Sequence, residues 1–311
     1  MEQLQELAIP GWEAREREIS YVGHGQSFDA WKLSDADGVL PPLIARVARR
    51  RDMPKPVDLE IAALRELDGT GLAPKLYLVD DSPEAAIGDL LIVTSFEPGA
   101  VKAPEEWTFA EVCAVIDRAA QLHAATAREG TSSGVGWLDG SLEYWRETAP
   151  ETLAAEPLAS LVFAVDAFVR EREGAFDRLT EVALVHGDLV ASNVLLEEGE
   201  PRFVDWEWAE VDDVARDLAL IGGTVYGGEW YVPLTEEQGA ELVTRYAAAR
   251  GLTLSERADL ATRRDVWIAM DRLFSSIHYA LNGTPAQRWA AAHMQDTLSH
   301  QLGVSFASPS T

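Results

Sequence analysis

The sequence predicts an α+β fold, with a small β-rich part over residues 1–97 and a larger, mainly helical part over residues 98–311. Before residue 97, short apolar runs alternate with glycine- and proline-containing turns, which is typical of strands. After residue 98, apolar positions recur at helical spacing and capping residues mark helix ends. A chain of 311 residues is long enough to bury the core of one large domain or of two lobes.

The β-rich part contains four predicted strand segments and one helix. Residues 20–33 are predicted to form a hairpin and residues 43–48 the next strand. A helix is predicted to open at Asp58, after a proline. Strands at 75–79 and 90–94 follow, and the second is almost entirely apolar, which places it in the interior of the sheet.

The hairpin and the next strand carry residues suited to binding phosphates. Gly23 and Gly25 would let backbone amides approach a phosphate closely, and Ser27 adds a hydroxyl donor. Arg46 is always charged and can bridge a phosphate through two N–H groups. Alternatively, the glycines form a tight turn only and Arg46 simply begins the basic cluster with residues 49–51.

The helical part is read from apolar spacing and from capping patterns. Residues 130–140 are glycine-rich and are predicted to be a loop at the border of an acceptor pocket. Helices are predicted over 109–126, about 158–172, from the Thr235–Gln238 capping box to Gly251, from Ser255 to about Leu281, and from Thr284–Pro285 to Gly303.

Residues 182–217 contain the most informative pattern of the chain. Apolar runs at 182–185 and 193–196 are followed by a third run that ends at Val204-Asp205, and residues 197–201 read as a hairpin turn. This pattern places three polar side chains at the ends of adjacent short strands: Asp188, Asn193 and Asp205.

These residue types suit phosphoryl transfer, which depends on positioning and on neutralising charge. Asp188 is the candidate base for an acceptor hydroxyl, and Asn193 and Asp205 are the candidate ligands of Mg²⁺. An amide at residue 193 supplies a metal ligand without a second negative charge, which would raise the pKa of Asp188. Taken singly, each residue could instead cap a turn.

The segment resembles the aminoglycoside phosphotransferase-like kinases, which share the protein-kinase fold. The family's HGDxxxxN pattern is matched by His186-Gly187-Asp188 and Asn193, its metal-binding aspartate by Asp205 in VDWE, and its later DLA element by Asp217-Leu218-Ala219. The resemblance implies a two-lobed protein-kinase-like fold, Asp188 as catalytic base, Asn193 and Asp205 as magnesium ligands, and a structural role for Asp217.

The resemblance also implies how ATP or GTP is held together with Mg²⁺. Arg46 stands where kinases place the lysine that binds the nucleotide phosphates, and Glu60 would pair with it; alternatively, Glu60 is an exposed residue favoured by the helix dipole. The segment after residue 94 resembles the hinge between lobes. The Ser95 carbonyl and the Glu97 amide would there hold the adenine.

Residues for the acceptor are less clearly marked. Acidic and aromatic side chains of the second part could line its pocket, although each one alone could be a core aromatic or a solvated carboxylate. Glu207 and Trp208 are preferred because they follow Asp205 directly. The candidates are Glu207, Trp208, Glu229, Trp230, Asp265 and Asp271.

Composition limits the class of partner. The formal charge of −26 disfavours binding to nucleic acid and to anionic membranes. Residues 1–100 carry 10 basic and 18 acidic side chains and the rest of the chain 16 and 34, so a cationic acceptor would be drawn to the second part. The single cysteine, Cys113, excludes an internal disulfide, and the first residues lack the pattern of a signal peptide. We therefore expect a cytoplasmic protein.

The sequence thus predicts a phosphotransferase that moves the γ-phosphate of ATP or GTP to a hydroxyl of a small molecule. An antibiotic is the preferred acceptor, because the second part is acidic and arginine far outnumbers lysine, which suggests a GC-rich bacterial source. A metabolic kinase for choline, homoserine, a fructosamine or a thioribose is the alternative. A binding module that has lost catalysis is the third hypothesis, although all three candidate residues are present.

Overall fold

The computed structural model describes residues 2–13, 15–25, 27–49, 55–82, 87 and 90–304. The chain divides into two compact units. Unit 1 contains Met1–Ala100 and Arg202–Ala209, and unit 2 contains Val101–Pro201 and Glu210–Thr311. An antiparallel sheet followed by a mainly helical region confirms the predicted α+β class.

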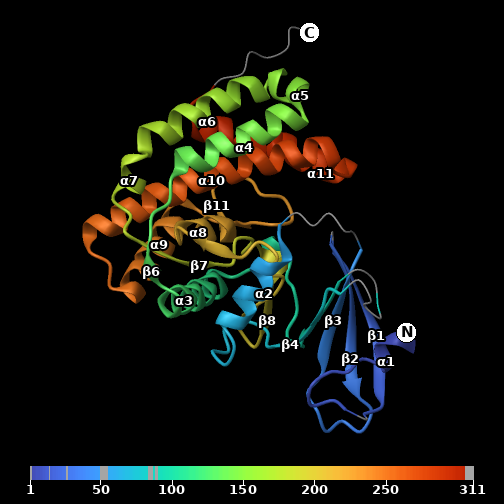
Figure 1. The fold of residues 1–311 in the computed structure, drawn as a ribbon. Helices are drawn as coiled ribbons and strands as arrows, with labels where there is room; N and C mark the ends of the chain where they lie inside the picture. Colours follow the sequence, from blue (N-terminus) through green and yellow to red (C-terminus); the bar gives the residue numbers. More distant parts are fainter. Residues whose placement is uncertain are drawn as a thin grey trace. The chain divides into compact units, whose positions relative to one another are not determined.

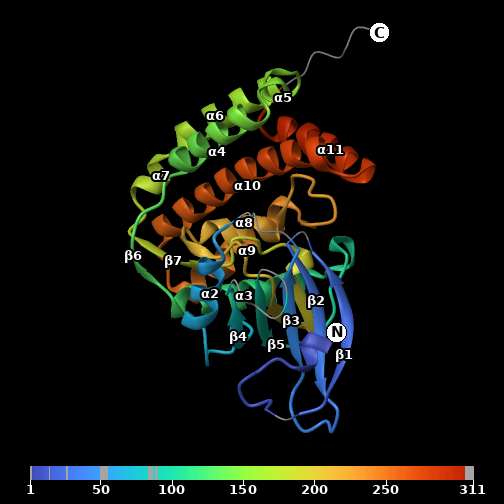
Figure 2. The ribbon, with the colours of Figure 1, turned by 45° about the vertical axis from the view of Figure 1, so that its right-hand side comes forward.

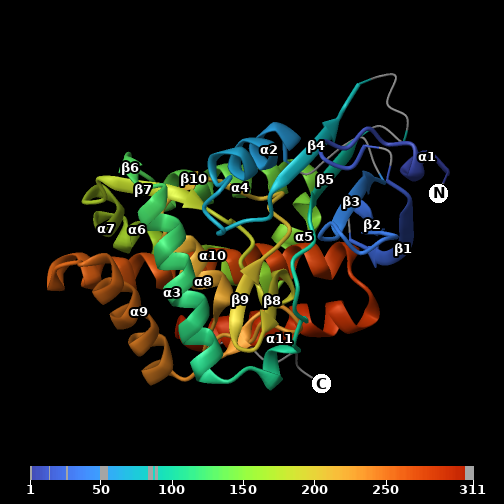
Figure 3. The same cartoon turned by 90° about the horizontal axis from the view of Figure 1, so that it is seen from below.

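Unit 1 is built on a five-stranded antiparallel sheet (Figure 3). Its strands are β1 (Arg17–His24), β2 (Phe28–Asp35), β3 (Leu43–Ala48), β4 (Leu76–Asp80) and β5 (Leu91–Ser95), in the order β1-β2-β3-β5-β4. β5 lies between β3 and β4, as its apolar sequence predicts. Since both of its neighbours hydrogen-bond to it, four of its five residues are buried.

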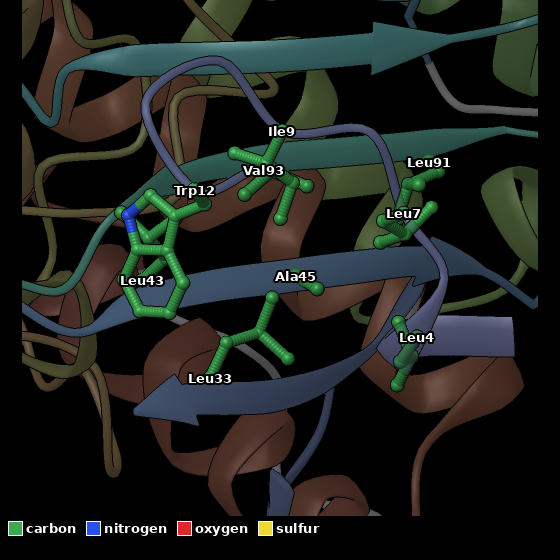
Figure 4. Close-up of a cluster of buried hydrophobic side chains, with 9 residues drawn as sticks. All are labelled: Leu4, Leu7, Ile9, Trp12, Leu33, Leu43, Ala45, Leu91 and Val93. Carbon is green, nitrogen blue, oxygen red and sulfur yellow. The ribbon is translucent and has the colours of Figure 1, made fainter. Parts of the chain in front are cut away.

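The segment before β1 covers one face of this sheet (Figure 4). It begins with the short helix α1 (Glu2–Gln5), and its apolar side chains pack on three strands. The buried cluster consists of Leu4, Leu7, Ile9 and Trp12 from the segment and Leu33, Leu43, Ala45, Leu91 and Val93 from the sheet. Burial of these side chains holds β2, β3 and β5 together and so fixes the strand that carries Arg46.

Helix α2 (Val57–Glu66) follows Pro56, as predicted. It buries Ile61, Ala63 and Leu64 together with the carboxylate residue Glu60. Residues 50–54 of the predicted basic cluster lie outside the described residues.

Unit 2 carries the polar pattern on short strands. β7 (Glu181–Val185) lies between β10 (Glu210–Asp212) and β6 (Arg128–Glu129) in an antiparallel sheet. After β7 come a 3₁₀ turn, η2 (Ala191–Asn193), and the paired strands β8 (Val194–Glu197) and β9 (Glu200–Phe203). The turn between β8 and β9 confirms the predicted hairpin, with Glu198 and Gly199 at positive φ.

The helices of unit 2 pack around α10 (Leu254–Asn282), which contacts α11 (Pro285–Gln301), α8 (Ala215–Ile221) and α6 (Leu158–Arg172) (Figures 1 and 2). A second pair is formed by α3 (Phe109–Ala125) and α9 (Glu236–Arg250). The remaining helices are η1 (Pro104–Glu106), α4 (Gly134–Thr148), α5 (Pro150–Ala154) and α7 (Gly174–Asp177).

One prediction for this region is wrong. Residues 130–140 were expected to be a loop, but α4 begins at Gly134, with Ser133 as its N-cap. The glycines there make room for packing, because a Cβ at Gly134 would lie 2.9 Å from the ring of Phe176. The long helix α10 also starts earlier than expected, since Thr253 and Glu256 form its capping box.

Among the described residues, no helix has both the length and the apolar composition needed to cross a membrane.

Candidate functional site

The loop after β7 brings Asp188 and Asn193 together in unit 2. The Asn193 Nδ2 group donates to the Asp188 carboxylate Oδ2 at 2.8 Å and to the Asp188 main-chain oxygen at 2.9 Å. The sequence folds this way because the η2 turn carries Asn193 back over the loop. Both donor positions of the amide are therefore directed at Asp188, and its oxygen Oδ1 accepts no hydrogen bond from any described residue.

The same loop is held by Asp217 of α8. This fully buried carboxylate accepts hydrogen bonds from the main-chain N–H groups of His186 (2.8 Å) and Gly187 (2.9 Å). It also pairs with His123 Nε2 at 3.1 Å, and the other ring nitrogen of His123 contacts the Tyr246 hydroxyl at 2.8 Å. Burial by itself would raise the pKa of Asp217, but these hydrogen bonds hold that pKa below its usual value.

Asp217 and His123 therefore stabilise the loop in the way the sequence suggested. Gly187 has a φ of 77°, a left-handed conformation that favours glycine, and it lets two consecutive amides point at one carboxylate. Arg216, the neighbour of Asp217, donates to the Gly187 carbonyl at 3.4 Å. Two adjacent residues of α8 thus fix the backbone that carries Asp188.

In unit 1, Arg46 joins two carboxylates. Its guanidinium forms an ion pair with Glu60 of α2 and a second one with Asp205 Oδ1 at 3.4 Å. It also lies over the ring of Phe28, 4.7 Å from the centroid. Burial would lower the pKa of Arg46, but Glu60 and Asp205 hold it above its usual value, so the guanidinium stays charged. The predicted pairing of Glu60 with Arg46 is present.

Asp205 follows β9 in a strained backbone conformation, with a φ of 65°. Next to it, Trp206 is buried and donates from its indole nitrogen to the Phe203 carbonyl at 3.2 Å. This anchor directs Asp205 away from the core, and its side chain is 44% exposed. A half-exposed carboxylate beside Arg46 is available to a ligand.

Glu207 joins this group in unit 1. Burial, and then the charge of Asp205, raise the pKa of Glu207 to about 7, and the Ser27 hydroxyl lies beside its carboxylate. Trp208 lies against Lys55, with the ammonium 5.7 Å from a ring centroid. The structure therefore places both residues, which the sequence favoured for the acceptor, among the groups expected to bind the nucleotide.

The turn between β1 and β2 contains the predicted phosphate-binding glycines. A Cβ added at Gly23 or at Gly25 would meet nothing within 4 Å, so packing within the protein does not explain these glycines. The turn is tied to β3, because Arg49 donates from its side chain to the Gly25 carbonyl at 2.9 Å and from its backbone to the Ser27 carbonyl at 2.8 Å.

The predicted hinge begins where β5 ends. The Ser95 hydroxyl accepts from the Lys75 amide at 2.9 Å and donates to a Glu97 carboxylate oxygen at 2.7 Å. Arg202 also pairs with this carboxylate at 3.4 Å. The side chain of Glu97 is therefore structural, whereas its main-chain N–H makes no hydrogen bond with a described residue.

The acceptor candidates of unit 2 fall into two groups. Glu229 and Asp271 both raise the pKa of Tyr279 through their charge, and Trp230 stacks on the ring of Tyr279. Asp265 is exposed elsewhere on α10, near Arg264 and Arg172. The sequence-based analysis missed Tyr279, although it lies eight residues after Asp271 and so on the same face of α10.

Residues 18–264 of the chain match the phosphotransferase enzyme family. No curated protein matches the chain. Solved structures share its fold over most of their length. Choline kinase from Cryptosporidium parvum Iowa II is 15% identical, with 97% of this chain and 95% of that chain covered and a TM-score of 0.65. A thermostable mutant of aminoglycoside phosphotransferase APH(4)-Ia is 14% identical (93% and 97% covered, TM-score 0.62). Macrolide 2′-phosphotransferase MphH from Brachybacterium faecium is 20% identical (95% and 97% covered, TM-score 0.57).

Proposed function

This chain belongs to the phosphotransferase enzyme family and is a small-molecule kinase, and we propose that it phosphorylates a hydroxyl group of an antibiotic. ATP is the phosphate donor of the family, and a structure of the similar APH(4)-Ia mutant contains AMP-PNP together with hygromycin B. GTP is the alternative donor. The finer assignment of donor, acceptor and residues to this chain is our proposal.

The pairing of Asn193 with Asp188 is the observation that carries the proposal. A base for phosphoryl transfer must hold a fixed direction toward the acceptor hydroxyl, and two hydrogen bonds from one amide provide it. The acceptor oxygen forms a bond to the γ-phosphorus, and the bond between that phosphorus and the bridging oxygen breaks, with its electron pair leaving on the nucleoside diphosphate. The hydroxyl proton passes to Asp188.

The two candidate metal ligands are of the type that Mg²⁺ prefers. Asn193 presents an amide oxygen that no described residue uses, and Asp205 presents a half-exposed carboxylate, and both are hard oxygen ligands. Bound with nucleotide, the ion would neutralise charge on the phosphates. The described residues contain no cluster of three His, Cys, Asp or Glu that would form a separate metal cage.

Arg46 supplies the positive charge for the nucleotide phosphates. Glu60 is 2% exposed and fixes one side of the guanidinium, so its remaining N–H groups keep their direction. Asp205 is the second partner of the guanidinium, at a longer distance. The open turn at Gly23 and Gly25 would cover the phosphates through backbone amides.

The experiment that tests this proposal measures acceptor-dependent release of nucleoside diphosphate. The panel contains aminoglycosides, macrolides, peptide antibiotics and nucleoside antibiotics, together with choline, homoserine, a fructosamine and a thioribose. Mass spectrometry should show a product heavier by one phosphoryl group, and expression in a sensitive host should protect growth against the same antibiotic. If only a metabolite is phosphorylated, the antibiotic assignment fails and the metabolic kinase replaces it.

A further inference from the structure

A loop in unit 2 is tied to the loop that carries the candidate base. Residues 224–231 are closed at their ends by the parallel pairing of β11 (Gly222–Gly223) with β12 (Val232–Pro233). A Cβ at Gly222 would lie 2.0 Å from the Val232 carbonyl oxygen, so this closure requires glycine. The Ala191 amide then donates to the Trp230 carbonyl at 2.8 Å. Because Ala191 lies between Asp188 and Asn193, Trp230 has a fixed position relative to both.

Trp230 stacks on Tyr279 of α10. The ring centroids are 4.2 Å apart and the planes differ by 8°, so nothing fits between the rings. Both side chains are half-buried. Neither the indole N–H of Trp230 nor the hydroxyl of Tyr279 hydrogen-bonds to a described residue. The pair therefore offers two unused donors beside the candidate base.

Three carboxylates act on the Tyr279 hydroxyl. Burial, and then the charges of Asp188, Asp271 and Glu229, raise the pKa of this tyrosine. Asp271 pairs with Arg272, which offsets one of these charges, while Glu229 is exposed and receives only a long hydrogen bond of 3.5 Å from Gln287. A net negative field next to aromatic rings attracts an organic cation.

We propose that Trp230 and Tyr279 position the acceptor of the phosphoryl transfer, and that this acceptor is a hydroxyl compound that carries a cationic amine. This inference rests on the proposed function. The two donors would bind oxygen atoms of the acceptor, while Glu229 and Asp271 would bind its ammonium group. The main-chain bond from Ala191 to Trp230 would keep the reacting hydroxyl in register with Asp188.

The positioning role is tested with Tyr279→Phe and Trp230→Phe, each of which keeps an aromatic ring and removes one donor. For each variant we expect the KM for the acceptor to rise about 3- to 10-fold, the usual effect of one lost hydrogen bond. The KM for the nucleotide and the slow hydrolysis of nucleotide without acceptor should stay within about twofold. Tyr144→Phe, at an exposed tyrosine of α4 in the same unit, is the matched control and should change neither constant. Unchanged acceptor constants in both variants would overturn the role of this pair.

The charge requirement is tested with matched acceptors. Each hydroxylated amine that is turned over is compared with its N-acetyl derivative, and choline is compared with 3,3-dimethylbutan-1-ol, which has the same shape without the charge. We expect kcat/KM to fall at least about tenfold on loss of the charge. Equal turnover of the neutral compound would refute the cationic class while leaving phosphotransferase activity in place. If no compound of the panel is phosphorylated by the wild type, the proposed function fails and this inference fails with it.

Discussion

The buried carboxylate of Asp217 gives the most demanding test of how the loop around Asp188 is held. Its oxygen Oδ2 accepts from the His186 amide and from His123, while Oδ1 accepts from the Gly187 amide. In Asp217→Asn, one of these oxygens becomes an NH₂ group that faces another donor. The variant loses at least one charge-assisted hydrogen bond and leaves a buried donor unpaired, so unfolding should become easier by about 2–5 kcal/mol.

The loss should also reach catalysis, because the two amides belong to the backbone that carries Asp188. A displacement of about 1 Å at a reacting group can cost on the order of 10² in rate. The assays are urea unfolding and kcat with a good acceptor. Asp166→Asn is the control, because Asp166 lies on the surface of α6 in an ion pair with Arg170 and should cost at most about 1 kcal/mol. If Asp217→Asn unfolds like the wild type and keeps its kcat, Asp217 does not support the loop.

The pH dependence of the same variant provides an independent check. The pKa of Asp217 is lower in the folded protein than in the unfolded chain, so its contribution to stability is present above the unfolded pKa, about 4, and is lost as the pH falls through the folded pKa. The amide that replaces this carboxylate in the variant cannot titrate. The stability difference between wild type and variant should therefore be largest near neutral pH and shrink below about pH 4.

Three further substitutions test separate parts of the structure. Asp188→Asn should lower kcat by about 10² to 10⁴ with nucleotide affinity largely kept, and a retained rate would exclude Asp188 as the base. Glu60→Gln should raise the nucleotide KM about 5- to 50-fold, because Arg46 loses its charged partner, whereas Asp58→Asn on the exposed side of α2 should not. Gly251→Ala should destabilise by about 1 kcal/mol, since Gly251 ends α9 at a φ of 66°, while Gly140→Ala inside α4, where a Cβ meets nothing within 4 Å, should stabilise slightly; thermal unfolding compares the two.

Elements with local signals could be predicted from the sequence. The strand at 43–48 and the helix at 158–172 have the predicted bounds, and the capping box of Thr235 with Gln238 begins α9 as expected. Caps, turns and apolar periodicity act within a few residues, so they can be read without the fold. The start of α4 could not be read, because its glycines serve packing against Phe176, which is 42 residues further along than Gly134.

The same limit applies to the candidate site. Asp188 and Asn193 are five residues apart, and their hydrogen bonds follow from one loop. Trp230 and Tyr279 are brought together by a loop and a distant helix, so no short pattern in the sequence marks the pair. Glu207 and Trp208 were assigned to the acceptor because they follow Asp205 in sequence, yet their contacts are with unit 1. Adjacency along the chain is therefore a weak guide to the acceptor pocket.

The acidic composition does not by itself identify where a cation binds, because many of the carboxylates of unit 2 already have arginine partners. Asp117 pairs with Arg245, and Asp259 pairs with Arg178. Such pairs cancel charge at short range and attract a ligand only weakly. Glu229 has no arginine or lysine partner among the described residues, and it lies near Tyr279 together with Asp188. The uncompensated charge, rather than the total, therefore directs a cationic acceptor to the face of α10 beside the candidate base.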